Sequence, residues 1–152
     1  SLVISPESGV VDVSKGMEFS GANNPIWIVR DKNNLSGELE NDSEKYEEES
    51  VALVEIKGDR QPVGTYSRNF PFEINKVNLY KGDVLYLFSD GYADQFGGEK
   101  GKKMKYKPFK KMLVSISHLS MGIQERQLNE NFDTWKSNFE QVDDVCVIGV
   151  KI

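Results

Sequence analysis

The order of apolar and polar residues predicts a chain that is mostly strands up to about residue 90, then helical, with one last strand. Apolar runs at 26–29, 51–56 and 84–88 have the length of strands rather than helices. The run at 84–88 is apolar at consecutive positions, which predicts a strand buried on both faces. A further strand is expected at 72–79, with a bulge near Asn75.

Glycine, asparagine and proline separate these runs. The triplet 14–16 predicts the turn of a hairpin from Val10 to Phe19, and Lys81-Gly82-Asp83 predicts a second hairpin turn. Residues 20–25 read Ser-Gly-Ala-Asn-Asn-Pro, which favours a tight loop over regular structure.

Two helical stripes follow, and both are expected to face the core. The first begins after Pro108, which suits a first helical turn, and consists of Phe109, Met112, Leu113 and Ile116. The second consists of Leu128, Phe132, Trp135 and Phe139. A last buried strand is expected at 145–150. Strands on both sides of two helices predict an α+β fold, with the helices outside an antiparallel sheet or sandwich.

The segment 31–50 differs from its surroundings. It is polar and turn-rich, and its second half carries seven acids against one lysine: Glu38, Glu40, Asp42, Glu44, Glu47, Glu48 and Glu49. Self-repulsion and the lack of apolar residues predict a mobile, solvated loop between strands. We therefore interpret residues 1–152 as one domain with an inserted acidic loop.

Composition narrows the function classes. A chain of 152 residues with 38% hydrophobic residues can form one domain with a core. Its net charge of −5 argues against a nucleic-acid binder, and its apolar runs of about six residues are too short to span a membrane. The single Cys146 excludes a disulfide framework and is interpreted as buried strand filler in a cytoplasmic protein. Because His118 is the one histidine, a metal would need oxygen ligands, which indicates Mg²⁺, Mn²⁺ or Ca²⁺.

Two acidic sites flank expected strands. Asp90 follows the run at 84–88, while Asp143 and Asp144 precede the run at 145–150. If these strands are antiparallel neighbours, the acids lie at one end of the sheet and can share a divalent cation. Gly91 lets the backbone turn there without a Cβ clash. Taken singly, an Asp-Gly pair is typical of a turn and an Asp-Asp pair of a solvated flank, so the residues alone leave both interpretations open.

Three segments, taken in order, resemble a known family. They are 19–30, with Gly-Ala-Asn-Asn-Pro; 85–98, with Ser-Asp-Gly; and 141–150, with Asp-Asp-Val. Their sequence and spacing resemble the metal-dependent protein serine/threonine phosphatases of the type 2C-like fold, in the SpoIIE-like bacterial branch. The resemblance implies an antiparallel β-sandwich with outer helices.

The resemblance also implies roles for particular residues. Asp90 and Asp143 would bind the catalytic Mn²⁺ or Mg²⁺, and Gly91, Asn23 and Asp144 would shape the surroundings of these ligands. Members of the family carry a further, upstream aspartate that bridges two metals, and no matching motif precedes residue 19 here. The chain therefore resembles the C-terminal part of the domain, and alone it is expected to be inactive and to bind divalent ions weakly.

The function implied is that of a phosphatase module at the output end of a bacterial signalling protein, below an upstream sensor domain in the cytoplasm. Its substrate would be a phosphoserine or phosphothreonine protein such as an anti-sigma-factor antagonist. The alternative is a non-catalytic interaction or sensor module that keeps the fold; retention of Asp90 and Asp143 favours the enzyme. Seven lysines between 100 and 111 are interpreted as a solvated face rather than a docking surface. If the upstream strands of the domain are missing, they leave sheet edges without partners. Such edges predict self-association as a dimer, with the 10–19 hairpin as the expected participant.

Overall fold

The computed structural model describes residues 16–35, 46–47, 50–64 and 70–152. The strands are β1 (Met17–Phe19), β2 (Ile26–Asp31), β3 (Tyr46–Glu47), β4 (Val51–Ile56), β5 (Asn75–Val77), β6 (Val84–Phe88), β7 (Phe96–Gly97), β8 (Lys102–Lys103) and β9 (Val147–Lys151). The helices are α1 (Gly91–Asp94), α2 (Tyr106–Ile116) and α3 (Met121–Lys136), with a 3-10 turn at Lys32–Asn34. No helix in these residues is long and apolar enough to cross a membrane.

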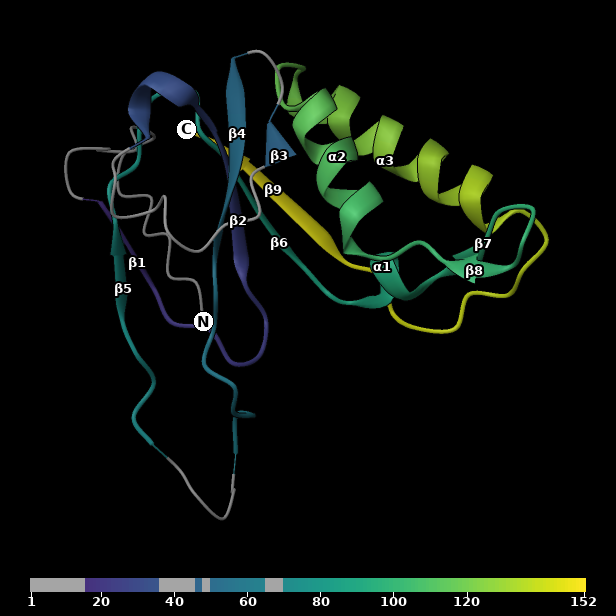
Figure 1. Cartoon of the computed structure of the whole chain (residues 1–152), viewed down its shortest axis with the longest axis horizontal. Coiled ribbons are helices and arrows are strands. Elements are labelled where there is room, and N and C mark those ends of the chain that lie inside the picture. Colours follow the sequence, from purple (N-terminus) through teal and green to yellow (C-terminus); the bar gives the residue numbers. More distant parts are fainter. Residues whose placement is uncertain (1–15, 36–45, 48–49, 65–69) are drawn as a thin grey trace.

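The centre of the fold is an antiparallel sheet of five strands in the order β3-β4-β2-β6-β9. A two-stranded ribbon, β1 with β5, lies on one side of this sheet, and α2 and α3 lie on the other (Figure 1). A short pair, β7 with β8, follows α1. The α+β prediction is therefore confirmed, with helices outside an antiparallel sheet.

Alternation along the central strands creates two cores, one on each face of the sheet. On β2, Trp27 and Val29 belong to the core beneath the helices, while Ile26 and Ile28 belong to the core beneath the ribbon. Successive side chains of a strand point to opposite faces, which explains the division. On β6, the apolar run 84–88 is divided in the same way, so the prediction of burial on both faces is confirmed.

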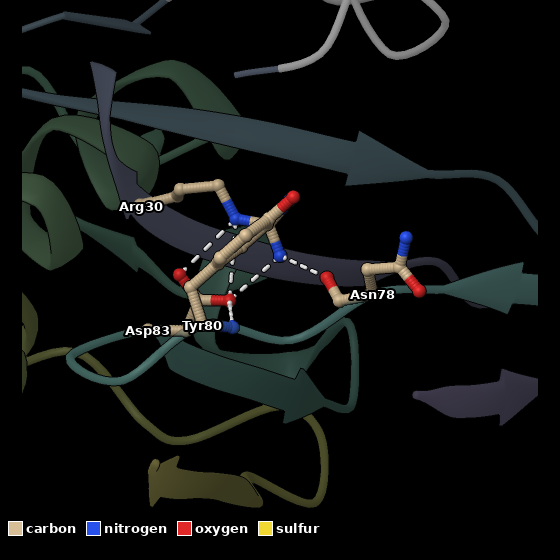
Figure 2. Close-up of polar contacts among 4 residues, drawn as sticks. All are labelled: Arg30, Asn78, Tyr80 and Asp83. Atoms are coloured by element: carbon tan, nitrogen blue, oxygen red, sulfur yellow. Dashed lines mark hydrogen bonds and ion pairs between the residues drawn. The ribbon is translucent and has the colours of Figure 1, made fainter. Parts of the chain in front are cut away.

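One buried ion pair joins the ribbon side of the sheet to the chain between β5 and β6 (Figure 2). The side chains of Arg30 and Asp83 are each 1% exposed, and Arg30 Nη2 lies 2.6 Å from Asp83 Oδ2. Arg30 also donates to the carbonyl oxygen of Asn78, and its guanidinium lies over the ring of Tyr80. The carboxylate of Asp83 accepts a further bond from the backbone N–H of Tyr80. Every partner of this pair therefore comes from either β2 or the segment 78–83.

Two expected hairpins differ from the structure. The first arm of the 10–19 hairpin lies outside the described residues, and its second arm, β1, pairs with β5. Residues 81–82 do form a turn, but it connects strands of different sheets rather than two arms of a hairpin. The strand expected at 72–79 with a bulge is shorter, because only residues 75–77 face the three-residue β1.

The acidic segment and the C-terminal third also differ. Within 31–50, Asp31 ends β2, a 3-10 turn follows, and 46–47 form β3; residues 36–45 and 48–49 lie outside the described residues. Phe139 is not part of α3, which ends at Lys136 because Ser137 adopts a left-handed backbone with φ 48°. Cys146 is exposed and precedes β9, so its interpretation as buried filler is wrong. β9 itself is a half-exposed edge strand rather than a buried one.

The lysine cluster is exposed apart from one member. Lys110 is buried in α2, where its Nζ lies 2.7 Å from Glu55 Oε2 and over the ring of Trp27. Trp27 Nε1 donates to the same carboxylate oxygen, at 2.7 Å. This lysine therefore ties α2 to the sheet instead of facing solvent.

Candidate functional site

Strand pairing brings the three motif-bearing segments to one end of the sheet. β6 and β9 are antiparallel, with Phe88 opposite Val147, so Asp90 and Asp143 both lie just beyond this end. β2 is antiparallel to β6 as well, with Trp27 opposite Tyr86, which places the loop 20–25 at the same end. The backbone arrangement expected for a shared site is therefore present.

Ser89 joins the two acidic segments. Its hydroxyl donates to the carbonyl oxygen of Asp144, at 2.7 Å, and accepts from the backbone N–H of Cys146, at 2.9 Å. Its own N–H donates to the carbonyl oxygen of Cys146, at 3.0 Å. These three hydrogen bonds of Ser89 fix the distance between the end of β6 and the residues that lead into β9.

Gly91 is required at this junction by close approach rather than by its backbone conformation. A Cβ at this position would overlap the carbonyl oxygen of Asp144 and crowd the side chain of Val145. Gly91 is buried and begins α1. Any larger residue would push the Asp143–Asp144 segment away from Asp90, so the glycine holds the two acidic segments together.

The carboxylates at this end are open to solvent. Asp90 and Asp143 are both exposed, and Asp143 Oδ1 accepts from the backbone N–H of Asp144 at 2.7 Å. Asp90 occupies the position before α1 without capping it through its side chain. In the described part of the chain, no group of three or more His, Cys, Asp or Glu side chains is placed to hold a metal ion. Sharing of one cation by Asp90 and Asp143 therefore stays a prediction.

The loop that carries Asn23 is held by the segment after β4. Asn23 is exposed with φ 61°, and its N–H donates to the carbonyl oxygen of Asp59 at 2.8 Å. The N–H of Asp59 donates to the carbonyl oxygen of Gly21, also at 2.8 Å, and the Asp59 carboxylate accepts from the N–H of Glu73. Gly58 allows this contact, because a Cβ there would lie 2.7 Å from the carbonyl oxygen of Asn24. The sequence analysis did not predict this contact between residues 57–59 and the loop.

The chain matches the family described as Stage II sporulation protein E (SpoIIE) over residues 10–152. The chain belongs to the SpoIIE family. The resemblance seen in the three segments is therefore confirmed, and the match spans all three of them.

A solved structure is similar to this chain. It is the "SiaA-PP2C domain of Pseudomonas aeruginosa", with a TM-score of 0.69 and 20% sequence identity. The match covers 91% of this chain and 47% of that chain, so this chain spans about half the length of the protein that it matches. At this identity the similarity shows the fold, which is that of part of a type 2C phosphatase domain. No curated protein matches the chain.

An aromatic cluster of Trp27, Phe88 and Tyr106 lies near Asp90. The rings of Trp27 and Phe88 have centroids 4.0 Å apart, and Tyr106, at the start of α2, lies 5.9 Å and 6.2 Å from them. Burial raises the pKa of Tyr106, and the nearby charges of Asp90, Asp94 and Glu55 raise it further, partly offset by Lys103. Tyr106 therefore holds its phenolic proton more tightly than a free tyrosine does.

An exposed ion pair lies next to this aromatic cluster. Lys103 Nζ lies 2.8 Å from Asp94 Oδ2, one helical turn after Asp90. The sequence interpretation missed Asp94, Lys103 and Tyr106 as neighbours of the site. The available signal was the position of Asp94 four residues after Asp90, which places the two on one side of a helical turn.

Proposed function

We propose that this chain is part of a metal-dependent protein serine/threonine phosphatase domain in a bacterial signalling protein. The observation that carries the proposal is the meeting of the loop 20–25, Asp90 and Asp143 at one end of the sheet. Membership of the SpoIIE family supports the reaction class. The proposed substrate is a phosphoserine or phosphothreonine protein such as an anti-sigma-factor antagonist, with a sensor domain upstream and the module in the cytoplasm.

The donor chemistry of the acidic end fits Mn²⁺ or Mg²⁺. Both ions bind anionic oxygens, and the exposed carboxylates of Asp90 and Asp143 offer them at one end of a rigid sheet. In the proposal these two residues hold the ion, which when bound would polarise a water and neutralise charge on the phosphoryl oxygens. Ser89 and Gly91 fix the spacing of the two carboxylates through the contacts described above.

Two carboxylates are few for a divalent ion that prefers about six oxygen ligands. We propose that further ligands come from a part of the domain outside these 152 residues. The matched SiaA-PP2C chain is about twice as long as this chain, which supports the existence of such a part. The 152-residue chain by itself is then expected to hydrolyse phosphate esters poorly. The test of function therefore uses the full-length protein that carries this chain.

The test measures hydrolysis of a phosphoserine peptide with and without Mn²⁺. Asp90→Asn and Asp143→Asn are expected to lower kcat/KM by about 100-fold or more, because each removes a ligand of the ion that stabilises the transition state. Asp133→Asn is the matched control, since Asp133 is an exposed acid on α3 and is expected to leave the rate unchanged. Hydrolysis that is independent of divalent ions, or equal in all three variants, would contradict the proposal.

The same experiment separates the alternative of a non-catalytic interaction module. Such a module would bind partners through the same fold and show no Mn²⁺-dependent turnover in the full-length protein. Absence of turnover with full folding, checked by circular dichroism, would therefore favour that alternative.

A further inference from the structure

Gln95 lies between the two acidic segments, and it is 0% exposed. It follows α1, five residues after Asp90. Its Nε2 donates to the carbonyl oxygens of Phe96 and Glu140, each at 2.9 Å. Glu140 precedes Asp143 by three residues. One buried amide therefore links the part of the chain that carries Asp90 to the segment that carries Asp143.

The backbone of Gln95 is itself fixed in place. Its carbonyl oxygen accepts from Met104 N–H, at 3.0 Å, and from Trp135 Nε1, at 2.9 Å. Trp135 belongs to α3, and its own carbonyl oxygen accepts from Gly98 N–H at 2.9 Å. Gln95 is therefore held against both α3 and the turn formed by β7 and β8, so its amide is a firm anchor for Glu140.

Two bridges connect the stretches 89–95 and 140–144. The hydroxyl of Ser89 makes the bridge at one end, and the amide of Gln95 makes the bridge at the other. The two stretches and their bridges form a closed ring, and both aspartates of the candidate site lie within it. Because successive Cα atoms are only about 3.8 Å apart, a short stretch that is held at both ends cannot move far from the stretch that faces it.

We propose that Gln95 is a positioning residue of the candidate metal site and that it acts through Asp143. Its bond to Glu140 holds the carboxylate of Asp143 at the distance from Asp90 that a shared divalent ion requires. The inference rests on the proposed function, in which these two aspartates bind the ion. Groups that orient the ligands of a metal typically contribute about 10–100-fold to metal affinity or activity.

Burial ties this role to contacts that the chain makes by itself. A part of the domain outside these 152 residues can add contacts at the surface, whereas the amide of Gln95 already has two acceptors in the interior. Gln95 Oε1 is buried and has no hydrogen-bond partner among the described residues. An unpartnered buried acceptor lowers stability, so core stability alone does not explain a glutamine at this position.

A second buried glutamine provides a matched control. Gln124 is 1% exposed and lies in the first turn of α3. Its Nε2 also donates to two carbonyl oxygens, those of Ser117 and Leu119. Leu119 accepts as well from Lys151, which pairs with Val84 at the end of β6 away from the aspartates. Gln124 therefore has the same burial and the same kind of bonds at a distance from the candidate site.

The test compares Gln95→Met and Gln124→Met in the full-length protein that carries this chain. Gln95→Met is expected to weaken Mn²⁺ binding by about tenfold or more, measured from the electron paramagnetic resonance signal of free Mn²⁺. The Mn²⁺ concentration that half-saturates hydrolysis should rise by a similar factor, with a smaller change in kcat at saturating Mn²⁺. Gln124→Met is expected to leave both values unchanged. In thermal melts it should nevertheless lose more stability than Gln95→Met, because it also removes the acceptor of the Tyr86 hydroxyl.

A double variant shows whether Gln95 acts through Asp143. Gln95→Met combined with Asp143→Asn is expected to bind Mn²⁺ no more weakly than Asp143→Asn alone, because Gln95 then has no ligand to position. Gln95→Asn is the second variant should Gln95→Met not fold. Its amide is one methylene shorter and lies farther from Glu140, so it is expected to weaken Mn²⁺ binding in the same direction.

The outcomes distinguish this inference from the proposed function. Unchanged Mn²⁺ affinity in folded Gln95→Met would overturn the inference even where the wild type is an Mn²⁺-dependent phosphatase. Equal losses of affinity in both methionine variants, or additive losses in the double variant, would also overturn it, since they indicate general destabilisation. A wild type that binds Mn²⁺ without hydrolysing a phosphoserine peptide contradicts the proposed function alone, and weaker binding in Gln95→Met would then still support the inference. A wild type that binds no Mn²⁺ overturns both.

Discussion

Removing the charge of Asp83 tests whether the buried ion pair stabilises the fold as the contacts indicate. Arg30 has its charged group 1% exposed, and Asp83 supplies its counter-charge through contacts of 2.6, 3.1 and 3.2 Å. In Asp83→Asn, Arg30 keeps its charge, because guanidinium groups do not deprotonate in proteins. The variant therefore leaves a buried cation without its counter-charge.

The expected cost is about 3–5 kcal/mol in the free energy of unfolding, which is typical when one partner of a buried pair is removed. For a domain of this size that corresponds to a fall of about 6–20 °C in melting temperature. Urea denaturation followed by tryptophan fluorescence measures it, because Trp27 is 1% exposed and lies in the core beneath the helices. Glu18→Gln is the control: its pair with Lys76 is exposed, and it should change stability by less than about 1 kcal/mol.

A double variant distinguishes the cost of losing the ion pair from the cost of leaving one buried charge without a partner. Arg30→Met with Asp83→Asn removes both charges, and the asparagine oxygen can still accept from Tyr80 N–H. It is expected to recover about 2 kcal/mol or more relative to Asp83→Asn alone. An Asp83→Asn variant that loses less than about 1 kcal/mol, or a double variant whose loss equals the sum of the single losses, would refute the reasoning.

Two further predictions concern the packing around the acidic end and the core. Gly91→Ala is expected to lower the free energy of unfolding by about 1–3 kcal/mol in urea denaturation, because the new methyl group overlaps the backbone of Asp144. Gly122→Ala is the control: its methyl group meets nothing within 4 Å, so the variant should be neutral or stabilised by up to about 1 kcal/mol. Equal losses in both variants would contradict the steric explanation. Burial raises the pKa of Tyr86 above its ordinary value of 10.0, so the folded state holds the phenol proton more tightly. The stability this contributes should be full well below pH 10 and be lost as the pH rises through 10 and beyond. Tyr86→Phe also removes a hydrogen bond to Gln124, so it should lower stability by about 1–2 kcal/mol at pH 7. Thermal melts of this variant should show a smaller loss of stability between about pH 9 and 11 than melts of the wild type. An equal loss in both proteins would show that other groups cause it.

The pattern of apolar residues predicted the central strands and the two long helices because their burial follows from local period. The run 84–88 is a central strand between β2 and β9, and its composition indicated this directly. The same kind of run at 145–150 gave the wrong burial for β9, because a strand's exposure depends on which strand lies beyond it. Phe139 continued the helical period, but α3 ends at Lys136, three residues before Phe139, because of the backbone turn at Ser137.

The motifs mark the two aspartates of the candidate site, whose role as ligands stays a prediction, while the surroundings of these aspartates come from distant positions. Asp90 and Asp143 are 53 residues apart, yet each stands at a strand end that a local motif marks. Tyr106 reaches the same end from the start of a helix, and no residue next to it signals that contact. The buried ion pair of Arg30 was likewise not predicted, because its partner Asp83 was interpreted only as part of a turn.

The central claim is that Asp90 and Asp143 hold one divalent ion, and titration of the chain with Mn²⁺ under NMR observation tests it most directly. Paramagnetic broadening does not require turnover, so it works even where binding is weak. The account predicts that amides at 89–91 and 143–146 broaden first, and that Asp90→Asn and Asp143→Asn each abolish this selective loss while Asp133→Asn retains it. Broadening that begins elsewhere, or that persists unchanged in both ligand variants, would contradict the claim.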